Sequence, residues 1–318
     1  MELSNSINSS RVTEFILIDF CTKPEDKIVF FLLFSLMYMM TVFGNGGIIF
    51  LVYHNTQLHT PMYCFITSLS FLDLCYSSDI VPKMLVNFLS EKKSISYIGC
   101  AVQLFVFCFL GSAECFLFAV MAYDRYVAIC KPLNYVLVMQ TQTCVSLISV
   151  AYAAGFLHSV IEICCTFSLS FCSSNTLHHF ACDFPPLLDV SCTDTSLNEW
   201  ILFILSSAII ISSIFIILMS YVTIFTVILK MKSNKGRKKA FSTCVSHIMS
   251  VTLLFGTLTY AYLSPKSKSS NGNGAVATVF YAVVMPLLNP MIYSFRNKDI
   301  ISVLKSTLHV RDTFGLSG

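Results

Sequence analysis

An aspartate and an arginine stand side by side at the end of a long apolar run. Asp124 and Arg125 lie in the segment MAYDRYVAIC (121–130), and residues 98–120 before it carry one formal charge, Glu114. A guanidinium is permanently charged and offers a planar fork of donors, so Asp124 is its natural local partner. If the run crosses a bilayer, the arginine reaches water or protein at the interface. The pair alone is explained by an interfacial ion pair that ends a helix.

Among the acids inside apolar stretches, Asp73 and Glu114 lie near the middle of theirs. Acids in a membrane are costly and normally face the interior of a helix bundle. Glu114 precedes Arg125 by 11 residues, about 16 Å along a helix, so we expect it near mid-membrane. The sequence is compatible with two alternatives. Either both acids are protonated or hydrogen-bonded, or they share a cation.

Four cysteines lie where an oxidising compartment is expected: Cys100, Cys172, Cys182 and Cys192. Four thiols allow three pairings. Three of them belong to the segment FCSSNTLHHFACDFPPLLDVSC (171–192), where His178 and His179 offer an alternative, a zinc or copper site. The regular spacing of the cysteines favours disulfides. Most of the other cysteines lie in apolar stretches, where a buried thiol acts as a small apolar residue.

The elements that position these groups follow from composition. The 318 residues are 55% hydrophobic and 12% charged, with a mean hydropathy of +0.74, whereas a soluble domain carries about 25% charged residues. A bilayer requires about 20 mainly apolar residues per span. Seven stretches qualify: 28–53, 61–85, 98–122, 143–168, 199–229, 240–263 and 275–294. We therefore expect an all-α membrane protein, a single seven-helix domain.

Two of the stretches contain atypical residues. The second carries Asp73, Asp79 and Lys83, and the seventh is broken by Pro286 and Pro290. Prolines are tolerated in spanning helices, where neighbours satisfy the freed carbonyls. The net charge of +3, without a basic and aromatic patch, gives no indication of nucleic acid as a partner.

Charge indicates the orientation. Residues 1–25 lack an apolar core, so we expect no cleavable signal peptide. One side of the bundle holds 12 Lys and Arg and the other 8, and KMKSNKGRKK (230–239) should stay cytoplasmic. The loop 54–60, on the same side, contains no Lys or Arg and taken alone favours the opposite orientation. We predict an extracellular segment 1–27, with a glycosylation acceptor at Asn8, and a cytoplasmic tail 295–318.

Five motifs occur in order at the ends of these stretches: GN (Gly44, Asn45), LHTPMYCFITSLSFLDLCY (58–76), MAYDRYVAICKPLNY (121–135), KAFSTCVSHI (239–248) and PLLNPMIYSFRNK (286–298). With them the chain resembles the olfactory receptors, within the rhodopsin-like G-protein-coupled receptors, over nearly its whole length. LHTPMY is similar to the tetrapod-type class, whose ligands tend to be volatile and hydrophobic. The family usually has FYG in the sixth span. This chain has Leu254-Phe255-Gly256 instead, so Phe255 lacks the usual tyrosine hydroxyl.

The resemblance implies a plasma-membrane receptor that binds a small volatile odorant and activates a stimulatory heterotrimeric G protein, which raises cAMP. It implies no cofactor apart from a sodium ion that often joins the polar cluster in the family. It pairs Cys100 with Cys182 and Cys172 with Cys192. The implied switch residues are Asp124, Arg125, Tyr126, Pro286, Asn289, Pro290 and Tyr293, and the polar cluster is Asn45, Asp73, Asn289 and Glu114.

The ligand is expected between the helices in their outer half. Phe107 with Gly111, and Cys108 with Ser112, are i,i+4 pairs on one side of the third span. By family position, Ser206, Ile209, Leu258, Thr259 and Tyr262 should face them. Amine receptors of the superfamily have an aspartate where Phe107 stands, so we expect a neutral ligand. His158 in the fourth span is expected to be a hydrogen-bonded interior residue.

Ile300, Leu304 and Leu308 recur every four residues, which is typical of a short amphipathic helix on the inner leaflet. The basic segment 230–239 can attract anionic lipid or contact the G protein. A transporter or channel is disfavoured because we find no inverted repeat. An enzyme is disfavoured because we find no HExxH, phosphate loop or plausible Ser–His–Asp set. A peptide or lipid receptor of the same fold is the closest alternative.

Overall fold

The structure is a computed structural model of the chain, and it describes residues 12–18, 24–171, 175–263, 273–294 and 300–303. Within these ranges, seven helices or helix series are long and apolar enough to cross a membrane. They are α1 (Pro24–His54), α2 (Pro61–Leu89), α3 (Tyr97–Cys130), α5 (Thr141–Phe167), α7 (Ser196–Lys230), α8 (Asn234–Leu263) and the series α9 (Asn273–Val279), the π-helical segment η4 (Phe280–Val284) and α10 (Met285–Ser294). Each overlaps one of the apolar stretches found in the sequence.

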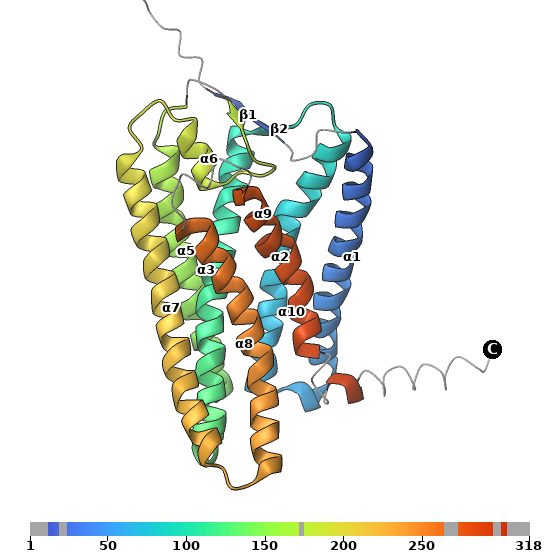
Figure 1. Ribbon diagram of the computed structural model, residues 1–318, viewed down its shortest axis with the longest axis vertical. Coiled ribbons are helices and arrows are strands. Elements are labelled where there is room, and N and C mark those ends of the chain that lie inside the picture. The colour runs from blue at the N-terminus through green and yellow to red at the C-terminus, as the bar shows by residue number, and fades with distance from the viewer. Residues whose placement is uncertain (1–11, 19–23, 172–174, 264–272, 295–299, 304–318) are drawn as a thin grey trace, which may run out of the picture.

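The helices stand side by side as one bundle, which Figure 1 shows with β1, β2 and α6 at one end and the connection between α7 and α8 at the other. We call these the sheet end and the far end. Helix α3 is central, since it packs against α2, α5, α7 and α8. A buried position suits a helix that is apolar on nearly all faces.

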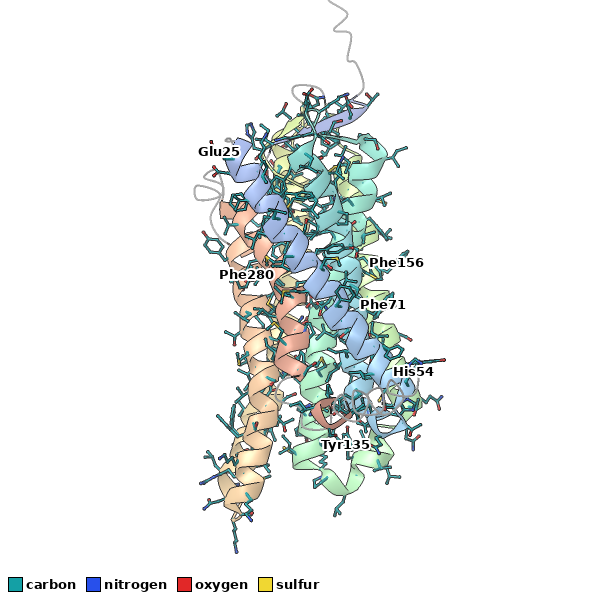
Figure 2. All side chains as sticks on the ribbon, turned by 90° about the vertical axis from the view of Figure 1, so that its right-hand side faces the viewer. Glu25, His54, Phe71, Tyr135, Phe156 and Phe280 are labelled. Atoms are coloured by element: carbon teal, nitrogen blue, oxygen red, sulfur yellow. A yellow bond between two sulfur atoms is a disulfide. The ribbon has the colours of Figure 1, made fainter. Side chains whose placement is uncertain are left out.

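The outer surface of the bundle carries many large apolar side chains. Phe71 on α2 and Phe156 on α5, both labelled in Figure 2, are each 52% exposed. Contiguous exposed apolar surface of this extent is typical of a protein whose solvent is lipid. The fold is therefore the seven-helix membrane bundle that the composition predicts.

A small sheet at the sheet end was not predicted. Strand β1 (Glu14–Leu17) lies between β2 (Ser94–Ser96), which is antiparallel to it, and β3 (Thr176–Leu177), which is parallel. Phe15 and Leu17 are buried, whereas Ile16 is 39% exposed, which is the alternation of a half-buried strand. The sheet thus joins three segments that lie far apart in the sequence.

Pro290 shapes the last helix and is supported by the first. Because proline has no backbone N–H, it leaves the carbonyl of Pro286 without its usual donor four residues on. Asn45 of α1 takes that place: its Nδ2 donates to the Pro286 oxygen at 2.8 Å. A Cβ added to the neighbouring Gly44 would come within 3.1 Å of the Pro290 ring. The GN pair therefore brings α1 close to α10 and satisfies a freed carbonyl, as expected for prolines in spanning helices.

Short helical segments occupy the far end. They are η1 (Thr56–Leu58), η2 (Pro132–Asn134), α4 (Tyr135–Val138) and a helical turn at 300–303. Ile300 and Val303 are buried against the bundle. Leu304 and Leu308, the other members of the predicted amphipathic helix, lie outside the described residues.

Candidate ligand-binding site and switch region

A cavity of about 60 Å³ lies between α2, α3, α5, α7 and α8 toward the sheet end. Its wall is formed by Tyr76, Phe107, Cys108, Gly111, Ser112, Cys115, His158, Phe184, Leu202, Ser206, Ile209, Ile210 and Leu258. None of these thirteen side chains is an Asp, Glu, Lys or Arg. A mostly apolar wall with a few hydrogen-bonding groups is typical of sites for small molecules.

Two aromatic rings of the cavity wall, Tyr76 and Phe107, contact a third ring outside the wall, Tyr281. The ring centroids of Tyr76 and Phe107 are 5.1 Å apart, and that of Phe107 lies 5.4 Å from Tyr281. Tyr281 belongs to the π-helical segment, whose extra residue per turn changes the direction of the side chains that follow. Phe107 thereby links the cavity to the last helix series.

The opposite side is polar. Ser112 Oγ lies 2.8 Å from His158 Nδ1, and Cys108 Sγ lies 3.3 Å from the same nitrogen. The other ring nitrogen, Nε2, faces Glu162 Oε1 at 3.5 Å. These residues come from α3 and α5, which approach so closely that a Cβ on Gly155 would meet the Phe109 carbonyl oxygen at 2.8 Å. His158 is hydrogen-bonded inside the bundle, as expected, and it also lines the cavity.

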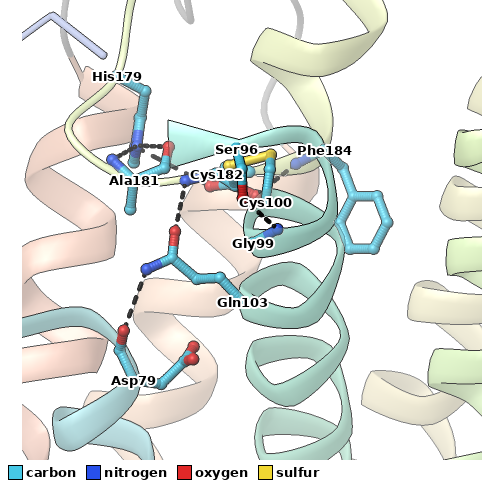
Figure 3. Close-up of a disulfide and its surroundings, with 10 residues drawn as sticks. Asp79, Ser96, Gly99, Cys100, Gln103, His179, Ala181, Cys182 and Phe184 are labelled. Carbon is cyan, nitrogen blue, oxygen red and sulfur yellow. Dashed lines mark hydrogen bonds and ion pairs between the residues drawn. A yellow bond between two sulfur atoms is a disulfide. The ribbon is translucent and has the colours of Figure 1, made fainter. Parts of the chain in front are cut away.

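A disulfide ties the segment over the cavity to α3. Cys100 is bonded to Cys182, and Figure 3 shows Gln103 one turn further along the helix, below the bond. Gln103 Oε1 accepts from the Cys182 backbone N–H at 3.0 Å, and its Nε2 donates to the Asp79 carbonyl oxygen at 3.0 Å. Phe184, in the short helix α6 (Phe184–Asp189), reaches the cavity wall from this segment. Cys192 is also disulfide-bonded, while Cys172 lies outside the described residues.

His179 anchors the same segment to the last helix series. Its Nε2 lies 3.2 Å from Thr278 Oγ1, which is itself 3.1 Å from the Tyr281 hydroxyl, and Asp183 Oδ2 lies 4.0 Å from Nε2. Burial lowers the pKa of His179 below its ordinary value, and the nearby Asp183 opposes that shift. The ring is therefore a neutral hydrogen-bonding group. No three His, Cys, Asp or Glu side chains gather as metal ligands anywhere in the described ranges.

A polar cluster lies deeper between α1, α2, α3 and α10. Asn289 Nδ2 donates to both carboxyl oxygens of Asp73, at 3.1 Å each. Asp73 and Glu114 are both buried, 2% and 6% exposed. Buried oxygens of Asn45, Glu114 and Asn289 have no hydrogen-bond partner among the described residues. Such oxygens are the ligands that a hard cation prefers.

The Asp–Arg pair lies at the far end of α3. Arg125 NH2 is 3.2 Å from Asp124 Oδ2, with side chains 11% and 1% exposed. Asp124 Oδ1 also accepts from the Tyr135 hydroxyl at 2.9 Å. Lys131 sits 5.5 Å from the centroid of the Tyr126 ring. The guanidinium is thus held by its own helix, with a small part of its surface open.

His247 joins three helices near this end. Its Nδ1 lies 2.9 Å from the Tyr221 hydroxyl of α7, and its Nε2 lies 3.1 Å from the Phe118 carbonyl oxygen of α3. His247 is 2% exposed and belongs to α8. The contact closes α8 against α3 and α7. Tyr293, on α10, is buried, and its hydroxyl is without a hydrogen-bond partner in the described part of the chain.

Comparison with known proteins settles the family. The family model for olfactory receptors matches residues 34–311. Olfactory receptor 5AP2 of Mus musculus is 50% identical over 303 residues, 95% of each chain. Olfactory receptor 5I1 of Homo sapiens is 49% identical over 301 residues, 95% of this chain and 96% of its own. Olfactory receptor-like protein OLF1 of Canis lupus familiaris is 47% identical over 304 residues, 96% and 98%. The chain belongs to the olfactory receptor family.

As an olfactory receptor, the chain is a multi-pass protein of the plasma membrane and not an enzyme. The family binds odorants, couples to G proteins and needs no cofactor. The row Ser112–His158–Glu162 does not contradict this. In serine hydrolases the serine faces Nε2 and the acid faces Nδ1, whereas this imidazole is turned the other way round.

The structure places most of the predicted ligand-contacting residues of this olfactory receptor on one cavity. Those in the wall are Phe107, Cys108, Gly111, Ser112, Ser206, Ile209 and Leu258. Thr259 is not among them, because it is exposed and lies one position round the helix from Leu258. Tyr262 belongs to α8, but its side chain lies outside what the structure describes. The predicted glycosylation site, Asn8, also lies outside the described residues. Tyr76, Cys115, His158, Phe184, Leu202 and Ile210 complete the wall and were not predicted.

Proposed function

We propose that this olfactory receptor detects small, neutral, hydrophobic volatiles and activates a stimulatory heterotrimeric G protein, which raises cAMP. The observation that supports the ligand class is the cavity beside α3, whose wall carries no charged side chain. A charged ligand would lose its hydration without gaining an ion partner there. An apolar ligand gains about 25 cal/mol per Å² of surface that it buries.

The size of the cavity limits the ligand. Its volume is about 60 Å³, whereas an apolar cavity of about 150 Å³ holds benzene. Ligands larger than a few heavy atoms therefore require side chains of the wall to move. Since a ligand acts only through different affinities for two states, this movement couples binding to the bundle.

We propose that Asp124, Arg125 and Tyr126, with Asn289, Pro290 and Tyr293, make up the switch toward the G protein. The short Arg125–Asp124 contact supports a resting role for the pair. The orientation that this requires has the sheet end outside and the basic segment 230–239 inside the cell. On intact cells, an amine probe that cannot cross membranes should then label Lys92, with a side chain 72% exposed, and leave Lys235 and Lys238 unlabelled.

The main test is a cAMP reporter screen of the full-length receptor with a broad panel of volatiles. Arg125→Ala should abolish the response while surface expression persists. Lys92→Ala, at the other end of the bundle, is the matched control and should respond as the unaltered receptor does. A full response of Arg125→Ala would contradict the assigned role.

We further propose that Asn45, Asp73, Glu114 and Asn289 hold a sodium ion. The unpartnered buried oxygens and the burial of two acids in one cluster support this. A bound cation lowers the cost of burying ionised carboxyl groups. Thermal stability of the purified receptor should rise when sodium replaces N-methylglucamine at constant ionic strength, and Glu114→Gln should reduce that rise.

A further inference from the structure

One residue of the cavity wall does not belong to a membrane-spanning helix. Phe184 is in the short helix α6, whereas the other wall residues are on α2, α3, α5, α7 and α8. Its side chain is buried, 3% exposed. A shift of this ring changes the size of the cavity without moving a spanning helix. The contacts that hold α6 in place therefore bear on the size of the ligand that fits.

The segment that carries α6 is held at its beginning by strand β1. We call residues 175–191 the cover segment. The Ile16 N–H donates to the Asn175 carbonyl oxygen at 2.7 Å. The Ile18 N–H donates to the Leu177 carbonyl oxygen at 3.0 Å. These backbone bonds fix the beginning of the cover segment on the N-terminal strand.

The side chain of Phe15, on the same strand, supports the other end of the cover segment. Ser191 forms an antiparallel bridge with Phe171. The Phe15 ring packs edge-on against the Phe171 ring, with the centroids 5.5 Å apart, and stacks on Tyr97 at the start of α3 at 6.1 Å. Phe15 is 0% exposed. Strand β1 thus supports both ends of the cover segment.

The disulfide alone does not fix the place of α6. It bonds Cys182, two residues before Phe184, to Cys100. One attachment point sets the position of the chain there, but not the direction in which α6 leaves it. That direction also depends on the end of the cover segment at Ser191, and hence on the support that this end receives.

The rings of Phe15 and Phe184 belong to one apolar cluster, together with Leu187 of α6. Neighbouring side chains relax partly into the space that a truncated core side chain leaves. In Figure 1, β1 lies above α6, at the outermost part of the sheet end. Truncation of Phe15 therefore lets α6 shift toward β1 and away from the ligand cavity.

We propose that strand β1, through Phe15, sets the largest odorant that the cavity accepts. Phe15 is a positioning residue, since it acts through Phe171 and α6 and is not part of the cavity wall. In the cavity of about 60 Å³, a larger ligand must displace the wall, and α6 is the wall element whose displacement leaves the helix bundle unchanged. This inference rests on the proposed function, because it presumes that volatiles bind in this cavity.

The test measures potency along a series of unbranched ligands of increasing length, taken from the chemical class most active in the broad panel, in the cAMP reporter assay of the full-length receptor. Potency should rise to an optimum length and then fall. Phe15→Ala should move the optimum to a longer ligand, with a gain of about 4-fold in potency for each further methylene that becomes buried. The shortest ligands should lose potency, because a wider cavity leaves them fewer contacts. Poor folding alone would lower the response to all lengths alike.

Four further variants test the route from Phe15 to the ligand. Ile16→Ala trims the next residue of the strand, 39% exposed, and should keep the optimum. Phe184→Ala widens the wall directly and should move the optimum in the same direction as Phe15→Ala. The double variant should shift it no further than Phe184→Ala does, because the two residues act through one ring. Phe15→Leu should shift it less, and it covers a failure of Phe15→Ala to reach the surface.

The size limit and the proposed function fail in different ways. An unchanged optimum in Phe15→Ala at normal surface levels, or in Phe15→Leu if only that variant reaches the surface, overturns the role of β1. Additive shifts in the double variant overturn it too. In each case the receptor still responds to volatiles, and the proposed function stands. A receptor that reaches the surface and responds to none of the broad panel overturns the proposed function and the size limit with it.

Discussion

Removing the imidazole of His247 should raise the activity of this olfactory receptor in the absence of any odorant. The ring joins α8 to α7 through Tyr221 and to α3 through the Phe118 carbonyl. If α8 swings away from α3 when the receptor is activated, both hydrogen bonds are lost in the active state. His247→Phe removes them from the resting state too and keeps a ring of similar size.

The size of the effect follows from the number of bonds. A buried hydrogen bond contributes a net stabilisation of about 1 kcal/mol, so two favour the resting state by about 2 kcal/mol. Without them the ratio of active to resting receptor rises about 30-fold. Tyr221→Phe removes one bond of the two, and the ratio should rise about 5-fold.

The assay is cAMP in cells without odorant, divided by the amount of receptor on the surface. His247→Phe should exceed Tyr221→Phe, and both should exceed the unaltered receptor. Basal cAMP equal to that of the unaltered receptor in both variants, at normal surface levels, would refute the reasoning. Both bonds would then be as favourable in the active state as in the resting one.

Three more outcomes follow from the geometry. In Gly111→Ala the new methyl group would lie 3.4 Å from the Tyr76 hydroxyl, in ordinary contact and inside the cavity, so the response to the larger ligands of the panel should fall at constant surface expression. In Gly155→Ala the methyl group would lie 2.9 Å from the Ala113 backbone nitrogen, so α3 and α5 must separate at a cost of about 1–3 kcal/mol. The midpoint of thermal unfolding should drop, and Gly46→Ala, with open space at its Cβ, should not lower it. Because the pKa of His179 is lowered in the folded state, the unfolded chain binds more protons below about pH 6.5, and stability should decrease as the pH falls through that range. His179→Gln should show a smaller decrease between pH 7.5 and pH 5.5 in the same thermal measurement.

Spacing within one helix allowed much of the cavity wall to be predicted. Phe107 and Gly111, like Cys108 and Ser112, lie one turn apart, so placing one member of each pair predicts the other. The rotation of α8 could not be read in the same way. Leu258 lines the cavity whereas the next residue, Thr259, is exposed, and which of two adjacent positions faces the bundle depends on how the whole helix is rotated.

The place of His158 in the cavity wall, with Glu162 beside it, was not predicted for a different reason. His158 and Glu162 are four residues apart in an apolar stretch, a pattern that marks a functional pair inside a membrane. That signal was available, but which helix the pair faces depends on the packing of α5 against α3. Close contact at Gly155 sets this packing, and no local pattern encodes it.

The order of synthesis sets a condition on the small sheet. A ribosome makes β1 first, yet its partner strands are Ser94–Ser96 and Thr176–Leu177. The second of these emerges only after four of the spanning helices have been made. The sheet around Phe15 and Leu17 can therefore be complete only after more than half of the chain has been made. Chaperones that survey nascent receptors would meet this apolar strand for as long as the later strands are missing, so its burial can report that the first 177 residues of the chain have come together.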